Sequence, residues 1–403
     1  MQARSLASSA LPGTGVAAGC DSQSPLAWVC IAWLVCLLLV WLLAVSPVVS
    51  LAAETRAEEK PVLTVLSWGG AYERAQQRAL FVPFSDATGI GVKVERYDGD
   101  LTALRQAVAD GHVPWDVIDM TRSTALAACD EGLLTSLARD GVLPAPDGTP
   151  PARDFIEGAL GDCFVTHSIF ATVLAYRTDA FPGRRPTRVK DLFDQQRFPG
   201  PRALQRTPKA NLEWALLAQG VPREELYRLL STPRGLSLAL APLEGLDDLR
   251  WWTRGDTPSR LLMDGEVVMA SGYNGRFFDA LVSQGAPIAI LWDGQVQEHE
   301  TWVVPRHVDH PQAAKAFIGF ATSAERQAEL TRYIPYGPSR QSAVPLIATH
   351  RDTGVDMRLY IPTHPLNSAN AVVLDERWYA STLRRITQYF DARLIDRDAA
   401  SAP

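Results

Sequence analysis

The sequence lacks the motifs that mark most catalytic and metal centres. It contains no C-x-x-C, H-E-x-x-H, G-x-S-x-G or phosphate-loop pattern, and its seven histidines are scattered. Ser67 and Ser271 have no base signature near them. These absences argue against an enzyme, and we expect neither a cofactor nor a metal ion.

Long basic runs and basic–aromatic patches are also absent, which argues against a nucleic-acid partner. The net charge is −6, with acidic and basic residues interspersed. The 403 residues are 47% hydrophobic, which is enough for a sizeable core and two domains. No internal repeat or low-complexity tract interrupts them.

The N-terminus carries an uncharged apolar run over residues 26–45, followed by small residues at Ser50 and Ala52. This pattern favours a secretory signal within residues 1–53, with an A-x-A-like cleavage site. The run is long enough to span a bilayer, so an uncleaved membrane anchor is the alternative. Either segment exports the rest of the chain.

The exported body contains two cysteines, Cys129 and Cys163. In an oxidising compartment we expect them to form a disulfide, with two buried free thiols as the alternative.

The body opens with a strand–turn–helix unit at residues 61–72. Residues 62–66 are aliphatic and β-branched and predict a buried strand, and Trp68, Gly69 and Gly70 then lead into a helix from about Tyr72 to Phe84. Ligands of open α/β sheets bind at such a corner, where free helix N–H groups face the carboxyl end of a strand.

Strands and helices then alternate. We expect strands at 91–97 and 115–120 and helices at 101–110 and 124–130, which predicts a parallel sheet covered by helices. A long β-rich run at 163–176 suggests a crossing into a second domain. Further elements are expected as strands at 198–204, 265–271, 286–292 and 301–305, and as helices at 189–194, 211–219, 275–284, 310–332 and 375–394.

Aromatic and charged residues gather at the expected strand ends. Together they supply an aromatic box for a cation, a carboxylate to pair with it and an arginine fork for a carboxylate. The candidates are Trp68, Tyr72, Arg202, Tyr273, Glu300, Trp302 and Tyr336, while Asn274 and Arg276 are either cleft residues or a helix cap that closes the lobes.

Residues 61–392 resemble the extracellular solute-binding proteins of ABC importers, in the branch that binds spermidine, putrescine and related amines. The resemblance rests on seven segments in the family's order, which are residues 67–72, 128–134, 198–202, 212–218, 273–276, 301–305 and 336–338.

This resemblance implies an α/β fold of two lobes, of the type II periplasmic-binding kind, with two crossover strands and a ligand cleft. Lobe 1 would comprise residues 61–175 and 301–403, including the C-terminal helix, and lobe 2 would comprise residues 176–300. The partners implied are a small amine and the permease subunits of an importer, with the binding protein itself a periplasmic monomer.

The resemblance also implies individual roles. Trp68 matches the aromatic of the first corner, Tyr273 a position that is usually Trp, Glu300 the acid that holds an ammonium, and Tyr336 a cleft tyrosine. Trp68, Tyr273, Trp302 and Tyr336 would form the apolar and cation–π walls, and Glu300 would pair with the ammonium.

One departure bears on the ligand. Polyamine binders carry an Asp-x-x-Glu pair where this chain has residues 207–210, Thr-Pro-Lys-Ala. Glu300 would supply one negative charge and Arg202 one positive charge. These charges favour an ω-amino acid such as 4-aminobutyrate over a polyamine, because an unpaired buried charge is costly. An anchored sensor or an enzyme on the same fold are the other function classes.

Overall fold

The computed structural model describes residues 61–137 and 141–396. The expected signal or anchor lies outside these residues. Within them, no helix is both long and apolar enough to cross a membrane. Residues 60–403 cluster as one unit, and the lobe boundaries expected at residues 175 and 300 remain predictions.

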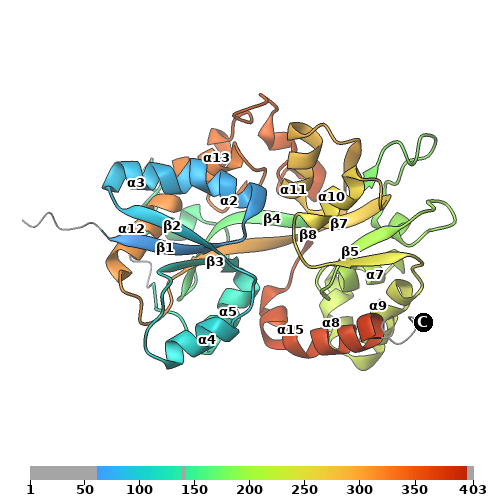
Figure 1. Cartoon of the computed structure of the whole chain (residues 1–403), viewed down its shortest axis with the longest axis horizontal. Helices are drawn as coiled ribbons and strands as arrows, with labels where there is room; N and C mark the ends of the chain where they lie inside the picture. Colours follow the sequence, from blue (N-terminus) through green and yellow to red (C-terminus); the bar gives the residue numbers. More distant parts are fainter. Residues whose placement is uncertain (1–60, 138–140, 397–403) are drawn as a thin grey trace, which may run out of the picture. The chain divides into compact units, whose positions relative to one another are not determined.

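One mixed sheet organises the body, with the strand order β2-β1-β3-β8-β4-β7-β5-β6 (Figure 1). Parallel pairing joins β1 to β2 and β3, and also joins β5 to β6 and β7, whereas β4 pairs antiparallel with β7 and β8. The strands are β1 (Val62–Ser67), β2 (Gly91–Arg96), β3 (Val117–Thr121), β4 (Phe164–Arg177), β5 (Arg202–Gln205), β6 (Leu249–Trp252), β7 (Met269–Tyr273), β8 (Ile288–Val303), β9 (Gly337–Pro338) and β10 (Val372–Val373). Two parallel units thus flank a central antiparallel pair.

The central pair corrects one prediction. The two strands expected at 286–292 and 301–305 are a single strand, β8, that pairs with β4 along its length. Its middle, residues 293–300, is polar in sequence and so does not read as a strand. Strands β4 and β8 are the two crossovers that the family resemblance implies.

Helices cover the sheet, and most expected helices are present (Figure 1). The helix expected at 72–84 is α2 and α3 with a π turn at Gln77–Phe81 between them. The helix expected at 310–332 is interrupted, because the Ser323 side chain accepts a hydrogen bond from the Arg326 amide and caps a new helix. The α-helices are α2 (Gly70–Gln76), α3 (Val82–Thr88), α4 (Thr102–Ala109), α5 (Arg122–Asp130), α6 (Pro151–Asp154), α7 (Asn211–Ala218), α8 (Leu226–Leu230), α9 (Pro233–Glu244), α10 (Thr257–Met263), α11 (Asn274–Phe278), α12 (Pro311–Ala321), α13 (Ala324–Thr331), α14 (Pro365–Ser368) and α15 (Glu376–Phe390).

Two large apolar cores lie within this frame. The first includes Phe81 from the π turn at Gln77–Phe81, Phe84 from α3 and Phe317 from α12. The second includes Trp214 from α7 and Tyr379 from α15. The buried side of the C-terminal helix therefore belongs to the second core, although the sequence prediction grouped this helix with lobe 1.

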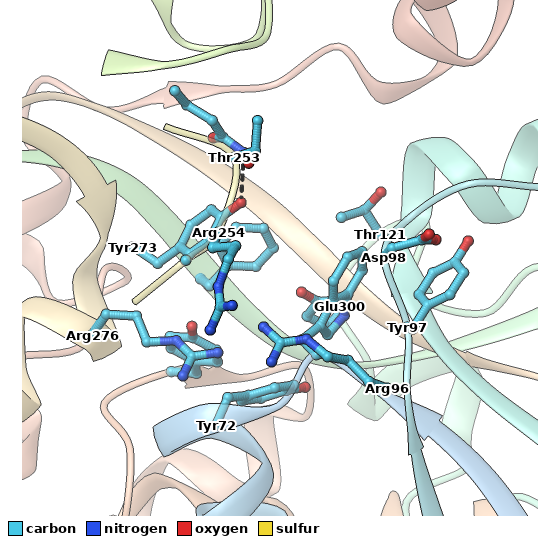
Figure 2. Close-up of a pocket in the computed structure, with 15 residues that line it drawn as sticks. Tyr72, Arg96, Tyr97, Asp98, Thr121, Thr253, Arg254, Tyr273, Arg276 and Glu300 are labelled. Atoms are coloured by element: carbon cyan, nitrogen blue, oxygen red, sulfur yellow. Dashed lines mark hydrogen bonds between the residues drawn. The ribbon is translucent and has the colours of Figure 1, made fainter. Parts of the chain in front are cut away.

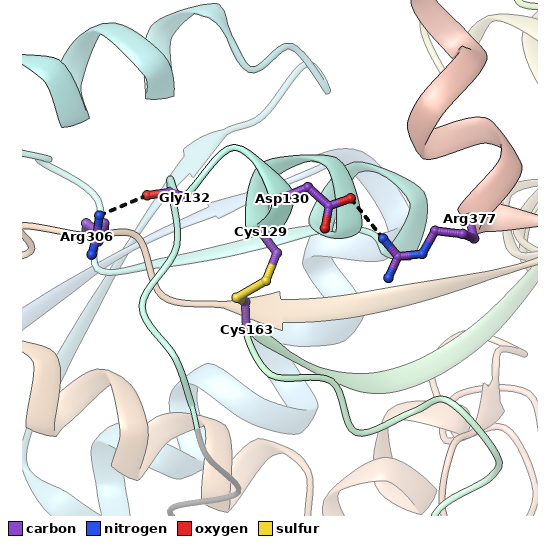
Figure 3. Close-up of a disulfide and its surroundings, with 6 residues drawn as sticks. All are labelled: Cys129, Asp130, Gly132, Cys163, Arg306 and Arg377. Carbon is purple, nitrogen blue, oxygen red and sulfur yellow. Dashed lines mark hydrogen bonds and ion pairs between the residues drawn. A yellow bond between two sulfur atoms is a disulfide. The ribbon is translucent and has the colours of Figure 1, made fainter.

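The expected disulfide is present (Figure 3). Cys129, near the end of α5, is bonded to Cys163, just before β4, with 5.9 Å between the two Cα atoms. The bond fastens α5 to the start of a crossover strand. Next to it, Arg377 of α15 donates a 2.8 Å hydrogen bond to Asp130.

Candidate functional site

A cavity of about 350 Å³ opens where the carboxyl ends of the parallel strands from both halves of the sheet converge (Figure 2). Its lining follows the ends of β1, β2, β3, β5, β6 and β7, which is the place where open α/β sheets bind ligands. The lining residues are Trp68, Tyr72, Arg96, Tyr97, Asp98, Thr121, Phe170, Gln205, Thr253, Arg254, Gly255, Tyr273, Arg276, Glu300 and Tyr336.

Two groups of contacting aromatic rings form the aromatic wall of this cavity. Tyr336 lies 5.3 Å from Tyr72 and 5.8 Å from Phe170, and Phe170 meets Tyr273 edge-on at 5.5 Å, all measured between ring centroids. Trp68 packs against Tyr97 at 5.0 Å. The wall can pack against an alkyl chain and present ring faces to a cation.

Glu300 of β8 is the buried acid of the cavity. Its carboxylate accepts a 3.2 Å hydrogen bond from the indole N–H of Trp68. Burial, followed by the negative charges of Asp119 and Glu298, raises the pKa of Glu300 well above its ordinary value. A nearby cation would favour the ionised form of Glu300 and so oppose this shift.

Asp119 lies behind Glu300 in a buried network. It accepts hydrogen bonds from the Tyr72 hydroxyl at 2.8 Å and from the Gln76 amide, and it lies 3.2 Å from His167. These contacts hold the Tyr72 ring in the wall. Asp119 is thus occupied by protein groups and is not part of the cavity lining.

Arg276, near the start of α11, is the buried base of the cavity. Its guanidinium donates a 2.7 Å hydrogen bond to the Gly69 carbonyl, while its buried Nε–H has no partner. Within residues 61–137 and 141–396, Arg276 forms no ion pair with a carboxylate. A buried guanidinium with a spare donor is a ready partner for an anion.

Gly69 and Gly70 contact Arg276 and do not line the cavity. Their φ angles are 71° and 63°, in the left-handed region that favours glycine. A Cβ on Gly70 would come within 2.0 Å of Arg276 Nη1. The two glycines therefore let the guanidinium lie directly against the first corner.

Two further arginines share the cavity. Figure 2 shows the guanidinium groups of Arg96, Arg254 and Arg276 converging on one region between Tyr72 and Tyr273. Arg254 pairs with Asp256 on the surface at 3.1 Å. Three guanidinium groups in one place create a positive potential that favours an anionic ligand group.

Arg202 corrects the sequence prediction. It is fully buried and donates hydrogen bonds to the carbonyl oxygens of Leu192, Gly200 and Phe198. Arg202 is the first residue of β5, so it lies at the strand end opposite the cavity, which Gln205 reaches at the other end. It braces the loop before β5 and is not a ligand fork.

Trp302 and Asn274 are also outside the cavity lining. Trp302 is fully buried in the first core, stacked on His167 with 4.5 Å between centroids. The Asn274 amide donates to the Pro335 carbonyl at 2.7 Å and its oxygen accepts from the Ala171 amide at 3.0 Å. Trp302 and Asn274 therefore pack outside the lining residues and do not face the cavity.

Sequence reasoning missed several lining residues. Arg96 is the last residue of β2, and Tyr97 and Asp98 follow it. Trp68 was selected because it follows a strand, and the same criterion would have selected these three residues. Thr253, Arg254 and Gly255 follow β6, a four-residue strand too short to recognise in the sequence. The remaining missed residues are Phe170 and Gln205, while Thr121 stands at the end of the strand expected at 115–120.

Comparison with known proteins identifies the family. The family described as bacterial extracellular solute-binding protein matches residues 79–355. The chain belongs to this family. A gamma-aminobutyric acid-binding protein of Pseudomonas aeruginosa is 34% identical over 342 residues, which cover 85% of this chain and 93% of that protein.

Solved structures share the fold of this solute-binding protein. The binding protein MotA of A. tumefaciens B6, in complex with glucopine, is 27% identical with a TM-score of 0.74, covering 83% of this chain and 99% of MotA. An ABC transporter substrate-binding protein of Bradyrhizobium japonicum is 27% identical with a TM-score of 0.73, covering 83% of this chain and 100% of that one. The expected two-lobed fold and the role of solute capture for an ABC importer are confirmed, and the family consists of binding proteins rather than enzymes.

Proposed function

We propose that this solute-binding protein captures 4-aminobutyrate or a related ω-amino acid. The observation that carries the proposal is the pair of opposite buried charges in one cavity, Arg276 without a carboxylate partner among the described residues and Glu300 with a raised pKa. Arg276 would bind the ligand carboxylate, and Glu300 would bind the ammonium. The aromatic wall between them would pack on the alkyl chain.

A polyamine fits this cavity less well. Each ammonium of a diamine needs a negative partner, and the cavity lining holds two carboxylates, the buried Glu300 and the exposed Asp98, against three guanidinium groups. The 4-aminobutyrate-binding relative from Pseudomonas aeruginosa supports an amino acid.

A larger amine bearing carboxylates is the second candidate. The cavity of about 350 Å³ exceeds the needs of a four-carbon amino acid, and Arg96 and Arg254 provide additional anion contacts. The glucopine complex of MotA, which is 27% identical to this chain, supports a ligand other than 4-aminobutyrate.

Family membership also suggests where the protein works and where its ligand goes. We propose that the protein is exported to the periplasm by residues 1–53, works as a monomer and hands its ligand to the permease of an ABC importer. The Cys129–Cys163 disulfide supports an oxidising compartment. Retention of residues 26–45 as an anchor is the alternative.

Isothermal titration calorimetry with 4-aminobutyrate, putrescine, spermidine and glucopine in parallel tests the ligand. Selective binding of 4-aminobutyrate supports the proposal, and selective binding of glucopine supports the second candidate. Binding of putrescine or spermidine alone would contradict both.

A further inference from the structure

A second buried carboxylate lies beside the cavity. Glu298 precedes Glu300 by two residues in β8, so the two side chains leave the same face of the strand. The charge of Glu298 raises the pKa of both Glu300 and Tyr273, which line the cavity. Without a partner, Glu298 would form a two-acid site with Glu300.

Lys209 neutralises the charge of Glu298 by forming an ion pair with it. Its ammonium lies 2.6 Å from the Glu298 carboxylate and donates a 2.8 Å hydrogen bond to the Ser123 hydroxyl. The Tyr379 ring is 5.7 Å from the same ammonium. The side chains of Lys209 and Glu298 are 13% and 5% exposed, so the pair is screened only weakly by water.

The loop that carries Lys209 is built to hold it. Asn211 donates hydrogen bonds to the carbonyl oxygens of Gln205 and Thr207 at 2.8 and 2.7 Å. Ala210, directly after the lysine, has a φ of 65°, which is strained for a residue with a Cβ. Gln205 at the start of this loop lines the cavity, whereas Lys209 lies outside the lining and is held against Glu298.

We propose that Lys209 is a specificity-determining residue: its ammonium occupies the place at Glu298 that a second ligand amine would need. The lysine thus makes a two-acid site into a one-acid site and excludes diamines. This inference rests on the proposed function, because it explains why that function is restricted to ligands with one ammonium.

The test is the putrescine affinity of the Lys209→Met variant. Methionine keeps the length of the side chain and removes its charge, which leaves Glu298 free to pair with an amine. We expect putrescine to bind at least about tenfold more tightly to K209M than to the wild-type protein, a typical gain for a newly paired buried charge. Lys190→Met, which removes an exposed lysine, is the matched control and should not change putrescine affinity.

A double variant tests whether Lys209 acts through Glu298. K209M/E298Q lacks the freed carboxylate, so the gain in putrescine affinity should disappear. Lys209→Gln, which retains hydrogen-bonding capacity at this site, serves as the second variant if K209M melts well below the wild type. A folded charge-removed variant that binds putrescine no better than the wild type would overturn the inference.

The inference and the proposed function fail separately. Titration of the wild-type protein with 4-aminobutyrate tests the function alone. If the wild type does not bind 4-aminobutyrate but K209M gains putrescine binding, the role of Lys209 is supported and the proposed ligand is wrong. If the wild type binds 4-aminobutyrate and K209M binds putrescine no better than the wild type, the proposed ligand is supported and the role of Lys209 is wrong.

Discussion

The guanidinium of Arg276 donates a 2.7 Å hydrogen bond to the carbonyl oxygen of Gly69, which lies 207 residues earlier in the chain. The bond joins the corner after β1 to the start of α11. Because the same guanidinium lines the cavity, the contact fixes the group that we assign to the ligand carboxylate.

Gly70→Ala should therefore reduce ligand affinity. The new Cβ would meet Arg276 Nη1 at 2.0 Å and push the guanidinium out of place. We expect a loss of about tenfold or more in 4-aminobutyrate affinity by calorimetry, equal to about 1.4 kcal/mol.

The control separates this clash from backbone strain. Gly285 has a φ of 67°, close to the 63° of Gly70, but a Cβ there would meet nothing within 4 Å. Gly285→Ala should cost about 1–2 kcal/mol of stability and leave affinity unchanged. Equal affinities for G70A and the wild type would show that Arg276 does not depend on this corner.

Ligand binding at Glu300 should release a proton. Burial raises the pKa of Glu300, and an arriving ammonium lowers it again because the ammonium favours the ionised form. Affinity for 4-aminobutyrate should accordingly increase as the pH rises towards that pKa. Calorimetry in buffers with different ionisation enthalpies measures the released proton directly, and Glu300→Gln should abolish the buffer dependence. Identical heats in all buffers would argue against this role.

Glu213 should make the protein less stable as the pH rises. Burial raises its pKa from 4.5 to about 7, so the folded protein holds a proton there that the unfolded chain has lost. The stabilisation is complete below about pH 4.5 and is lost by about pH 7, a change of roughly 3 kcal/mol. Urea unfolding across this range should show the slope, and Glu213→Gln should flatten it. If the free energy of unfolding of the variant depends on pH as that of the wild type does, groups other than Glu213 cause the dependence.

The disulfide should contribute strongly to stability. It closes a loop with a sequence separation of 34, for which the chain-entropy model gives about 3–4 kcal/mol. Cys129→Ala/Cys163→Ala should lower the free energy of unfolding by that amount. Reduction of the wild-type protein is the independent check, and no change under reducing conditions would contradict the estimate.

Five residues that the sequence analysis named as site candidates lie together in the structure. Trp68, Tyr72, Tyr273, Glu300 and Tyr336 all line the cavity. For Trp68 and Tyr273 the prediction followed from strand ends, because parallel strands end together at one edge of a sheet. Glu300 lies within β8, and Tyr336 was assigned from the family resemblance.

The same reasoning failed where it depended on the direction or length of a strand. Arg202 stands at the amino end of β5, and its side chain turns into the preceding loop. Trp302 belongs to β8 like Glu300, but it packs into the first core. Arg254 follows a strand of four residues that no periodic pattern reveals. These outcomes depend on tertiary packing, which a local pattern does not contain.

The central claim is that Arg276 and Glu300 are opposite poles of one ligand site. A crystal structure of the protein with 4-aminobutyrate tests it most directly. We predict the ligand carboxylate within about 2.7–3.2 Å of the Arg276 guanidinium and the ammonium at the same range from the Glu300 carboxylate. A ligand bound in the reverse orientation, or away from both side chains, would contradict the account.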